Sequence, residues 1–170
     1  MRLLKGFIIA LVGLAIMITL LSLLIPSRVM VTRAVVINTP ADKVMAQIKN
    51  LGNWKNWQPV FKTDSVKLTY NADSTTCQWE TNGKMNQFVI DSITQNAVYL
   101  SMQRKGEADV KNVLAVLPLT DQMGVQVEWR TITHLKWYPW EKFYGIFIDK
   151  LAGPGYEDAL KSLKEFVEAH

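Results

Sequence analysis

An unbroken run of apolar residues near the start of the chain is the first pattern in the sequence. Residues 7–25 are nineteen consecutive positions without a charged side chain. At 1.5 Å per helical residue they span roughly 28 Å, close to the thickness of a bilayer core. Arg2 and Lys5 precede the run, as in a signal peptide, but it exceeds the usual signal core and no small-residue cleavage pattern precedes Pro26. We therefore expect residues 1–27 to be an uncleaved anchor that crosses the membrane with residues 7–25.

Helical periodicity is strongest at the other end, in residues 138–169. The second half of this stretch carries an apolar stripe at helical spacing, formed by Tyr156, Leu160, Leu163 and Val167. The first half is apolar almost all round, and four residues are left to face water: Glu141, Lys142, Asp149 and Lys150. Such a helix must be covered by other parts of the fold. Because proline lacks an amide hydrogen, Pro154 between two glycines predicts a kink or a break between two helical segments.

The chain between these stretches begins with a strand and two short helices. Residues 29–38 alternate in polarity and are rich in β-branched side chains, which is typical of a half-buried strand. Thr39 is expected to cap a helix over residues 40–49, with proline in its first position. A second short helix, with tryptophan at both ends of residues 54–57, is expected to stop at Pro59.

Six further antiparallel strands are expected at a spacing of about ten residues. Turn sequences separate them, and the pair Asn82 and Gly83 is the strongest hairpin signal. The expected strands cover residues 66–70, 75–81, 85–93, 97–103, 107–119 and 125–136. Seven twisted strands form a curved sheet, and its concave face needs a cover. The order of elements therefore predicts an α+β fold, with a curved seven-stranded antiparallel sheet wrapped around a long C-terminal helix.

Charge and cysteine content narrow the possible partners. From Pro26 onward, 17 basic residues stand against 15 acidic ones, and no basic cluster is longer than Arg104 and Lys105. A nucleic-acid partner is therefore not expected. Cys77 is the only cysteine and does not identify the compartment. Basic residues flank both ends of the apolar run, but the short basic tail is expected to stay in the cytoplasm. The domain would then lie outside the cytoplasm.

Three stretches of the sequence resemble a known family. Residues 35–44 look like its opening strand with an Asn-x-Pro-x-x-x-Val passage into the first helix. Residues 51–59 are similar to its tryptophan-rich short helix, and residues 153–164 to its C-terminal helix signature. The family is the SRPBCC superfamily, which includes the START lipid-transfer domains, the birch-pollen allergen group and the polyketide cyclase/dehydrase-like proteins. Lys55 and Ala159 depart from the pattern, because proline and glycine are common there.

The resemblance covers roughly residues 29–169 and implies a domain of residues 28–170. Membrane-anchored bacterial members form a familiar subgroup, which implies a bacterial inner membrane. The resemblance also implies a helix-grip fold, with a cavity between the sheet and the long helix for a hydrophobic small molecule or lipid. Ten residues are candidates to line this cavity, because they lie on the inner face of the long helix or alternate toward the same face of the strands. They are Trp79, Leu100, Leu114, Val127, Trp129, Phe143, Phe147, Leu151, Tyr156 and Leu160. The alternative is that the same side chains fill a solid core, because pockets and cores have similar composition.

An aromatic cluster precedes the long helix. Trp137, Tyr138 and Trp140 are candidates for a cavity gate or for contact with the bilayer interface, where tryptophan and tyrosine prefer to lie. The alternative, and the more common role for aromatic residues, is that the cluster fixes the helix to the last strand.

The sequence offers little support for catalysis. It contains two histidines, His134 and His170, and no metal-ligand spacing, phosphate-binding loop or nucleophile elbow, so neither a metal nor a cofactor is expected. Cys77 is expected to pack as a small apolar residue. Two alternatives to ligand binding stay open: a polyketide cyclase/dehydrase-like enzyme, and a non-catalytic envelope protein that binds a protein partner. An enzyme would need polar residues inside the cavity, and an all-apolar lining would argue against it.

Overall fold

The computed structural model describes the chain except for residue 1, residues 64–65, residue 82 and residues 120–123. Its elements, in chain order, are α1 (Arg2–Leu23), β1 (Arg28–Ile37), α2 (Ala41–Ile48), two 3₁₀ helices η1 (Leu51–Asn56) and η2 (Pro59–Lys62), β2 (Thr69–Tyr70), β3 (Thr76–Thr81), β4 (Lys84–Ile93), β5 (Ala97–Arg104), β6 (Val110–Pro118), β7 (Val125–His134) and α3 (Pro139–Ala169). The predicted α+β class, seven strands and long C-terminal helix are confirmed.

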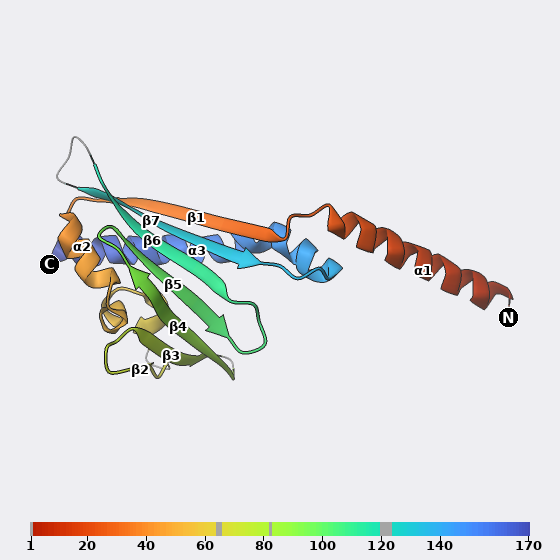
Figure 1. Ribbon diagram of the computed structural model, residues 1–170, viewed down its shortest axis with the longest axis horizontal. Helices are drawn as coiled ribbons and strands as arrows, with labels where there is room; N and C mark the ends of the chain where they lie inside the picture. The colour runs from red at the N-terminus through yellow and green to blue at the C-terminus, as the bar shows by residue number, and fades with distance from the viewer. Residues whose placement is uncertain (1, 64–65, 82, 120–123) are drawn as a thin grey trace.

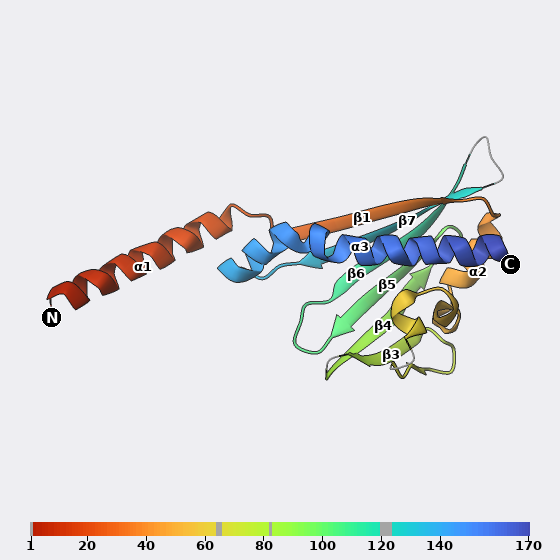
Figure 2. The same ribbon diagram turned by 180° about the vertical axis from the view of Figure 1, so that it is seen from behind.

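The seven strands form one antiparallel sheet in the order β1-β7-β6-β5-β4-β3-β2. Its register places Val35 opposite Val127, and Leu114 opposite Trp129, so inward positions of neighbouring strands meet. Helix α3 crosses one face of the sheet alongside β1, while β3, β4 and β5 fan away from it (Figures 1 and 2). The inner face beside the fanned strands is therefore not covered by α3 alone.

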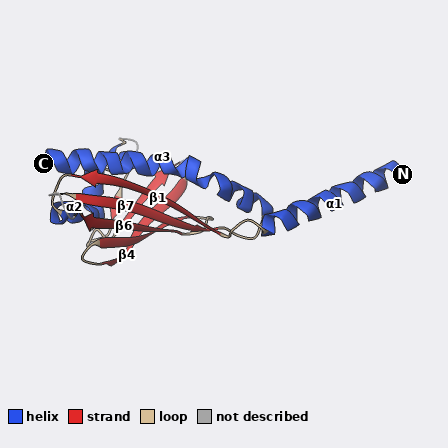
Figure 3. Cartoon of the chain, turned by 90° about the horizontal axis from the view of Figure 1, so that it is seen from above, coloured by secondary structure: helices blue, strands red, loops and turns tan. Residues whose placement is uncertain are grey.

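The hydrophobic core lies between this inner face, α2, the two 3₁₀ helices and the C-terminal half of α3. Trp54, Trp57 and Trp129 are fully buried there, with the Trp54 and Trp57 rings 4.9 Å apart. The tryptophan-rich segment therefore closes one end of the core. Helix α1 extends away from this domain, and its side chains are almost all exposed (Figure 3).

Several boundaries differ from the prediction. Of residues 66–70, only Thr69 and Tyr70 form a strand, paired with β3. The tryptophan-rich segment is a 3₁₀ helix, and Pro59 begins a second one. Thr39 does not cap α2. Pro40 occupies the cap position without a side-chain bond, and Thr39 Oγ1 instead donates to the backbone oxygen of Val167 in α3 at 3.5 Å.

Of the predicted kink or break at Pro154, the break is wrong, because α3 is one helix from Pro139 to Ala169. The helix bends without interruption, which agrees with the kink (Figure 3). Arg33 of β1 bridges the two sides of the proline. It donates from Nη1 to Asp149 at 2.9 Å and from Nε to Glu157 at 2.6 Å. The hydrogen bond from Arg33 also holds the pKa of Asp149 below its usual value. An ion pair on each side of the lost backbone bond thus supports the helix across Pro154.

Candidate ligand-binding cavity

Two cavities lie between the inner face of the sheet and the first half of α3. The proximal cavity, nearer to α1, measures about 500 Å³, and the distal cavity, beside η2, about 510 Å³. Met102, Arg104, Ala152 and Tyr156 line both. Shared walls on the sheet and on the helix make the two cavities neighbouring parts of one groove.

Aromatic rings build the distal cavity. Phe61 of η2, Trp79 of β3 and Phe88 of β4 line it together, with the Trp79 ring 5.1 Å from Phe61 and 5.0 Å from Phe88. Across the cavity, Trp129 and Tyr156 lie 5.1 Å apart. Burial raises the pKa of Tyr156 above its ordinary value, so its phenol stays protonated at neutral pH and keeps its proton for donation. This lining can hold an apolar or aromatic molecule.

Polar groups cluster along one wall of the groove, which β3, β4 and β5 form. Thr81, Asn86 and Arg104 occupy inward positions on β3, β4 and β5 and line the distal cavity. Carboxylate and imidazole groups are found in the proximal cavity, which is lined by Glu107, His134 and Glu141 among others. The lining is thus mixed rather than all apolar, and polar contacts are available to a ligand in either cavity.

The ten residues predicted to line a cavity separate into three groups. Trp79, Trp129, Leu151 and Tyr156 line the distal cavity. Leu100, Leu114, Val127 and Leu160 are buried in the packed core. Phe143 and Phe147 are 39% and 55% exposed and line neither of the two cavities, in contrast to the prediction. Ligand contact by the first group stays a prediction.

Glycine and lysine set the orientation of this half of α3. Gly145 and Gly153 are buried, and an added Cβ would clash with Leu135 Cδ1 and with Arg33 Nη2 respectively. Lys142, expected to face water, is only 3% exposed and donates from Nζ to the backbone oxygen of Ile25 at 2.9 Å. The helix backbone therefore approaches β1 and the loop before it. Phe143, Ile146 and Phe147 stay exposed, whereas Tyr144, Ile148 and Leu151 line the cavities.

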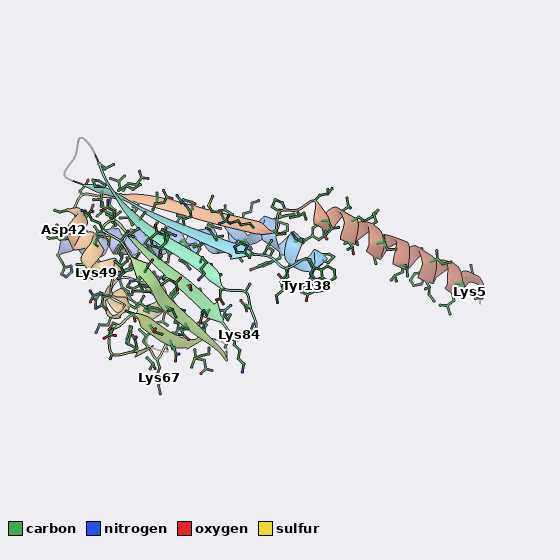
Figure 4. All side chains as sticks on the ribbon, in the orientation of Figure 1. Lys5, Asp42, Lys49, Lys67, Lys84 and Tyr138 are labelled. Atoms are coloured by element: carbon green, nitrogen blue, oxygen red, sulfur yellow. The ribbon has the colours of Figure 1, made fainter. Side chains whose placement is uncertain are left out.

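The aromatic cluster before α3 is exposed. Trp137 and Trp140 are 64% and 68% exposed, and the Tyr138 and Trp140 rings stack 4.9 Å apart. The expectation that these tryptophans fix the helix to the last strand is therefore wrong. Tyr138 lies at the end of the domain from which α1 departs, far from Asp42 in α2 and from Lys49 just after α2 (Figure 4).

Large apolar side chains continue along the first half of α3. Besides Phe143 and Phe147, the residues Tyr144, Ile146 and Leu151 are all at least half exposed. Within α1, the segment Leu3–Leu23 is long and apolar enough to cross a membrane, a property that it shares with signal sequences. Two apolar surfaces therefore meet where α1 joins the domain.

Sequence reasoning missed Arg104 and Asn86 as cavity residues. Arg104 continues the inward phase of Leu100 and Met102 on β5, so a charge in an otherwise apolar phase was the available signal. Within the described parts of the chain, no group of three histidine, cysteine or acidic residues could hold a metal ion.

The comparisons with known proteins identify the fold. No family model and no curated protein matches the sequence. Among solved structures, a START superfamily protein from Mycobacterium smegmatis superposes with a TM-score of 0.62 at 17% identity, over 83% of this chain and 98% of that one. The chain has the helix-grip fold, which START-like and birch-pollen-allergen-like proteins also have.

Other helix-grip structures agree with this assignment. Protein XoxI from Bacillus cereus has a TM-score of 0.62 at 15% identity, over 83% of this chain and 97% of that one. Norcoclaurine synthase from Thalictrum flavum, in complex with dopamine and hydroxybenzaldehyde, has a TM-score of 0.60 at 13% identity, over 84% of this chain and 88% of that one. At these identities the likeness shows the fold alone.

Proposed function

We propose that residues 28–170 are a helix-grip domain, held by a membrane anchor of residues 1–27, that binds and presents or transfers a hydrophobic small molecule or lipid. The observation that carries this proposal is the groove between the sheet and α3, with two neighbouring cavities of about 500 Å³ and 510 Å³. Ligand pockets usually have volumes of roughly 300–1,000 Å³, apolar walls and a few polar groups. The aromatic walls of the distal cavity and the polar side chains beside them fit that description.

Structural neighbours support the same class of ligand. START-like and birch-pollen-allergen-like proteins bind hydrophobic ligands, and norcoclaurine synthase holds two small aromatic molecules. The unfilled groove disfavours the alternative of a solid-core envelope protein that binds only a protein partner.

The exposed apolar half of α3 supports contact with the bilayer. Trp137, Tyr138 and Trp140 lie where α1 leaves the domain, and Lys142 ties α3 to the chain that follows α1, through the backbone oxygen of Ile25 and the hydroxyl of Ser27. An anchor that crosses the membrane would therefore place these aromatic residues at the membrane surface, where tryptophan and tyrosine are enriched. This position brings the proximal cavity close to the phase in which a lipid dissolves.

Cavity filling tests the binding proposal. Ala152 lines both cavities, whereas Ala169 is exposed at the end of the same helix. We expect native mass spectrometry of the full chain, purified in mild detergent, to detect a bound lipid-range mass that Ala152→Phe loses and Ala169→Phe keeps. A wild-type chain that carries no such mass and gains none from added lipid mixtures would contradict the proposal. An equal bound mass in Ala152→Phe would place the ligand elsewhere.

Cysteine labelling tests the membrane contact. With the full chain in lipid nanodiscs, we expect a charged maleimide to label Phe147→Cys about tenfold more slowly than Lys161→Cys, because Lys161 is exposed on the other half of α3. The native Cys77 is fully buried and adds little background. Equal labelling rates at the two positions would show that the first half of α3 lies in water.

An enzyme of the cyclase/dehydrase type is the second candidate, because Glu107, His134 and Glu141 line the proximal cavity. Both carboxylates are already engaged by the protein: Glu141 accepts from the Lys136 backbone nitrogen at 2.7 Å, and Glu107 pairs with Lys84 at 3.0 Å. This engagement favours binding over catalysis. A bound mass that changes during incubation of the purified chain would favour the enzyme instead.

A further inference from the structure

One charged side chain lies among the aromatic walls of the distal cavity. Of the described residues that line this cavity, only Arg104 carries a charge. Arg104 also lines the proximal cavity, so it stands where the two cavities meet. A cation next to apolar surface is unfavourable unless acceptors or an anion compensate it. The groups around Arg104 therefore indicate what the groove can bind.

Asn86, which is opposite Arg104 in the β4–β5 register, holds the guanidinium in place. The Asn86 side chain is buried, and its Nδ2 donates to the backbone oxygens of Lys84 at 3.1 Å and of Trp79 at 3.4 Å. These two bonds orient its Oδ1, which accepts from Arg104 Nε at 2.7 Å. Because a guanidinium has five N–H donors, an arginine fixed through Nε keeps donors on its outer nitrogens for a ligand.

The acidic neighbour of Arg104 does not balance the local charge. Glu107 Oε1 lies 3.0 Å from Lys84 Nζ and 3.5 Å from Arg104 Nη1, so two cations share one carboxylate. One positive charge is therefore in excess. Thr81 Oγ1, from the same wall, is buried and has no hydrogen-bond partner within the described parts of the chain. Both features suit a ligand that brings a negative charge and acceptor oxygens.

We infer that the groove takes an amphiphile with one anionic group, a carboxylate or a phosphate, which Arg104 binds while the aromatic walls of the distal cavity hold the apolar body. Planar guanidinium groups bind both anions through paired hydrogen bonds. The inference deepens the proposed function and rests on it, because it requires a ligand in the groove. It narrows the ligand class from hydrophobic molecules in general to anionic amphiphiles.

A matched pair of probes separates the charge from the apolar body. We would reconstitute the full chain in nanodiscs of a neutral lipid and titrate a fluorescent polyene fatty acid, with its carboxyl ionised, and the corresponding alcohol. Energy transfer from tryptophan reports binding, because Trp79 and Trp129 line the distal cavity. The wild-type chain is expected to bind the acid about tenfold more tightly than the alcohol after correction for partition into empty nanodiscs.

Substitutions of Arg104 and of a matched control assign this preference. Arg104→Gln is expected to abolish the acid preference, so that the acid and the alcohol bind with equal affinity. Arg130→Gln is the control, because Arg130 is an exposed arginine on the outer face of the sheet. Glu107→Gln is expected to increase the acid affinity by about threefold, since it releases Arg104 from its partner. A gain of this kind cannot result from misfolding.

The outcomes distinguish this inference from the proposed function. Equal affinity of the wild-type chain for acid and alcohol would overturn the inference and leave the binding proposal standing. Binding of neither probe would overturn both. An acid preference that survives in Arg104→Gln would also overturn the assignment to Arg104. Competition against the fluorescent fatty acid then identifies the anionic group, with lysophosphatidic acid compared with monoacylglycerol. Displacement by lysophosphatidic acid alone supports a phosphate head group. Displacement by neither competitor supports a carboxylate.

Discussion

The two halves of α3 have similar apolar content and opposite surroundings. Residues 156–169, the packed half, bury Ala159, Leu160, Leu163 and Val167 in the core. Residues 139–151, the open half, bury Lys142, Gly145 and Ile148 and expose their large aromatic and aliphatic side chains. The packed half thus stabilises the fold, whereas the open half forms one wall of the groove and an exposed apolar surface.

This difference shows that apolar content alone does not place a helix face in the core. In the packed half, apolar residues recur at helical spacing and define one buried stripe. In the open half and at its junction with the packed half, two glycines belong to the buried stripe, and Gly145 and Gly153 let the helix backbone approach its neighbours closely. Phe143, Ile146 and Phe147 stay exposed on the other side, which is unfavourable in water and suits an apolar phase.

Truncation of one large side chain in each half should show the largest difference in stability between the two halves. Leu163 is fully buried, so Leu163→Ala is expected to reduce the free energy of unfolding by about 3 kcal/mol. Phe147 is 55% exposed, so Phe147→Ala is expected to change the free energy of unfolding by less than about 0.5 kcal/mol. Denaturant unfolding of the full chain in detergent measures both. Similar losses in the two variants would show that the open half also stabilises the fold.

Titration of a buried thiol tests how tightly the core around the packed half is closed to water, because Cys77 belongs to the same core. Burial raises the pKa of Cys77 to about 11 from its ordinary value of 9.0. Between these two values the native chain keeps a proton that the unfolded chain has lost, so stability falls as the pH rises from about 9 to 11. The expected loss in the free energy of unfolding over this pH range is at most about 2 kcal/mol. Cys77→Ala, compared across the same pH range, should lack this part of the slope, and identical slopes would contradict the prediction.

Much of the fold could be predicted because alternation and periodicity are local. β1, β3, β4 and β7 lie within a few residues of their predicted bounds, since each alternates an inward with an outward phase. Residues 66–68 carry the same pattern and are not in a strand, which the pattern alone does not reveal.

The cavity was less predictable because its determinants are distant in sequence. Lys142 is typical of a solvent-facing residue, and its burial depends on the backbone oxygen of a residue 117 positions earlier. The role of Arg104 depends on Asn86, 18 positions earlier on the neighbouring strand. Glycines do not contribute to an apolar periodicity, so the buried stripe of the open half was not visible. Pockets and cores also share one composition, and only the packing distinguishes Trp79 from Leu100.

Two glycines at the junction of the halves should give the smallest effects, and effects of opposite sign. Gly155 faces the distal cavity, and a Cβ there meets no atom within 4 Å, so Gly155→Ala is expected to stabilise the helix by about 1 kcal/mol. Gly153 faces Arg33, and a Cβ there would displace the guanidinium that pairs with Asp149 and Glu157. Gly153→Ala is therefore expected to lower the thermal midpoint despite the same gain in helix propensity.

Thermal unfolding of the full chain in detergent compares the two variants directly, and Gly155→Ala should raise the midpoint by roughly 2–4 °C. Arg33→Gln in the Gly153→Ala background provides the control, because the clash requires the guanidinium in its observed position. If Gly153→Ala also raised the midpoint, the backbone of α3 would not be held against β1 at this point. The close approach at Gly153 would then not determine which face of the open half turns outward.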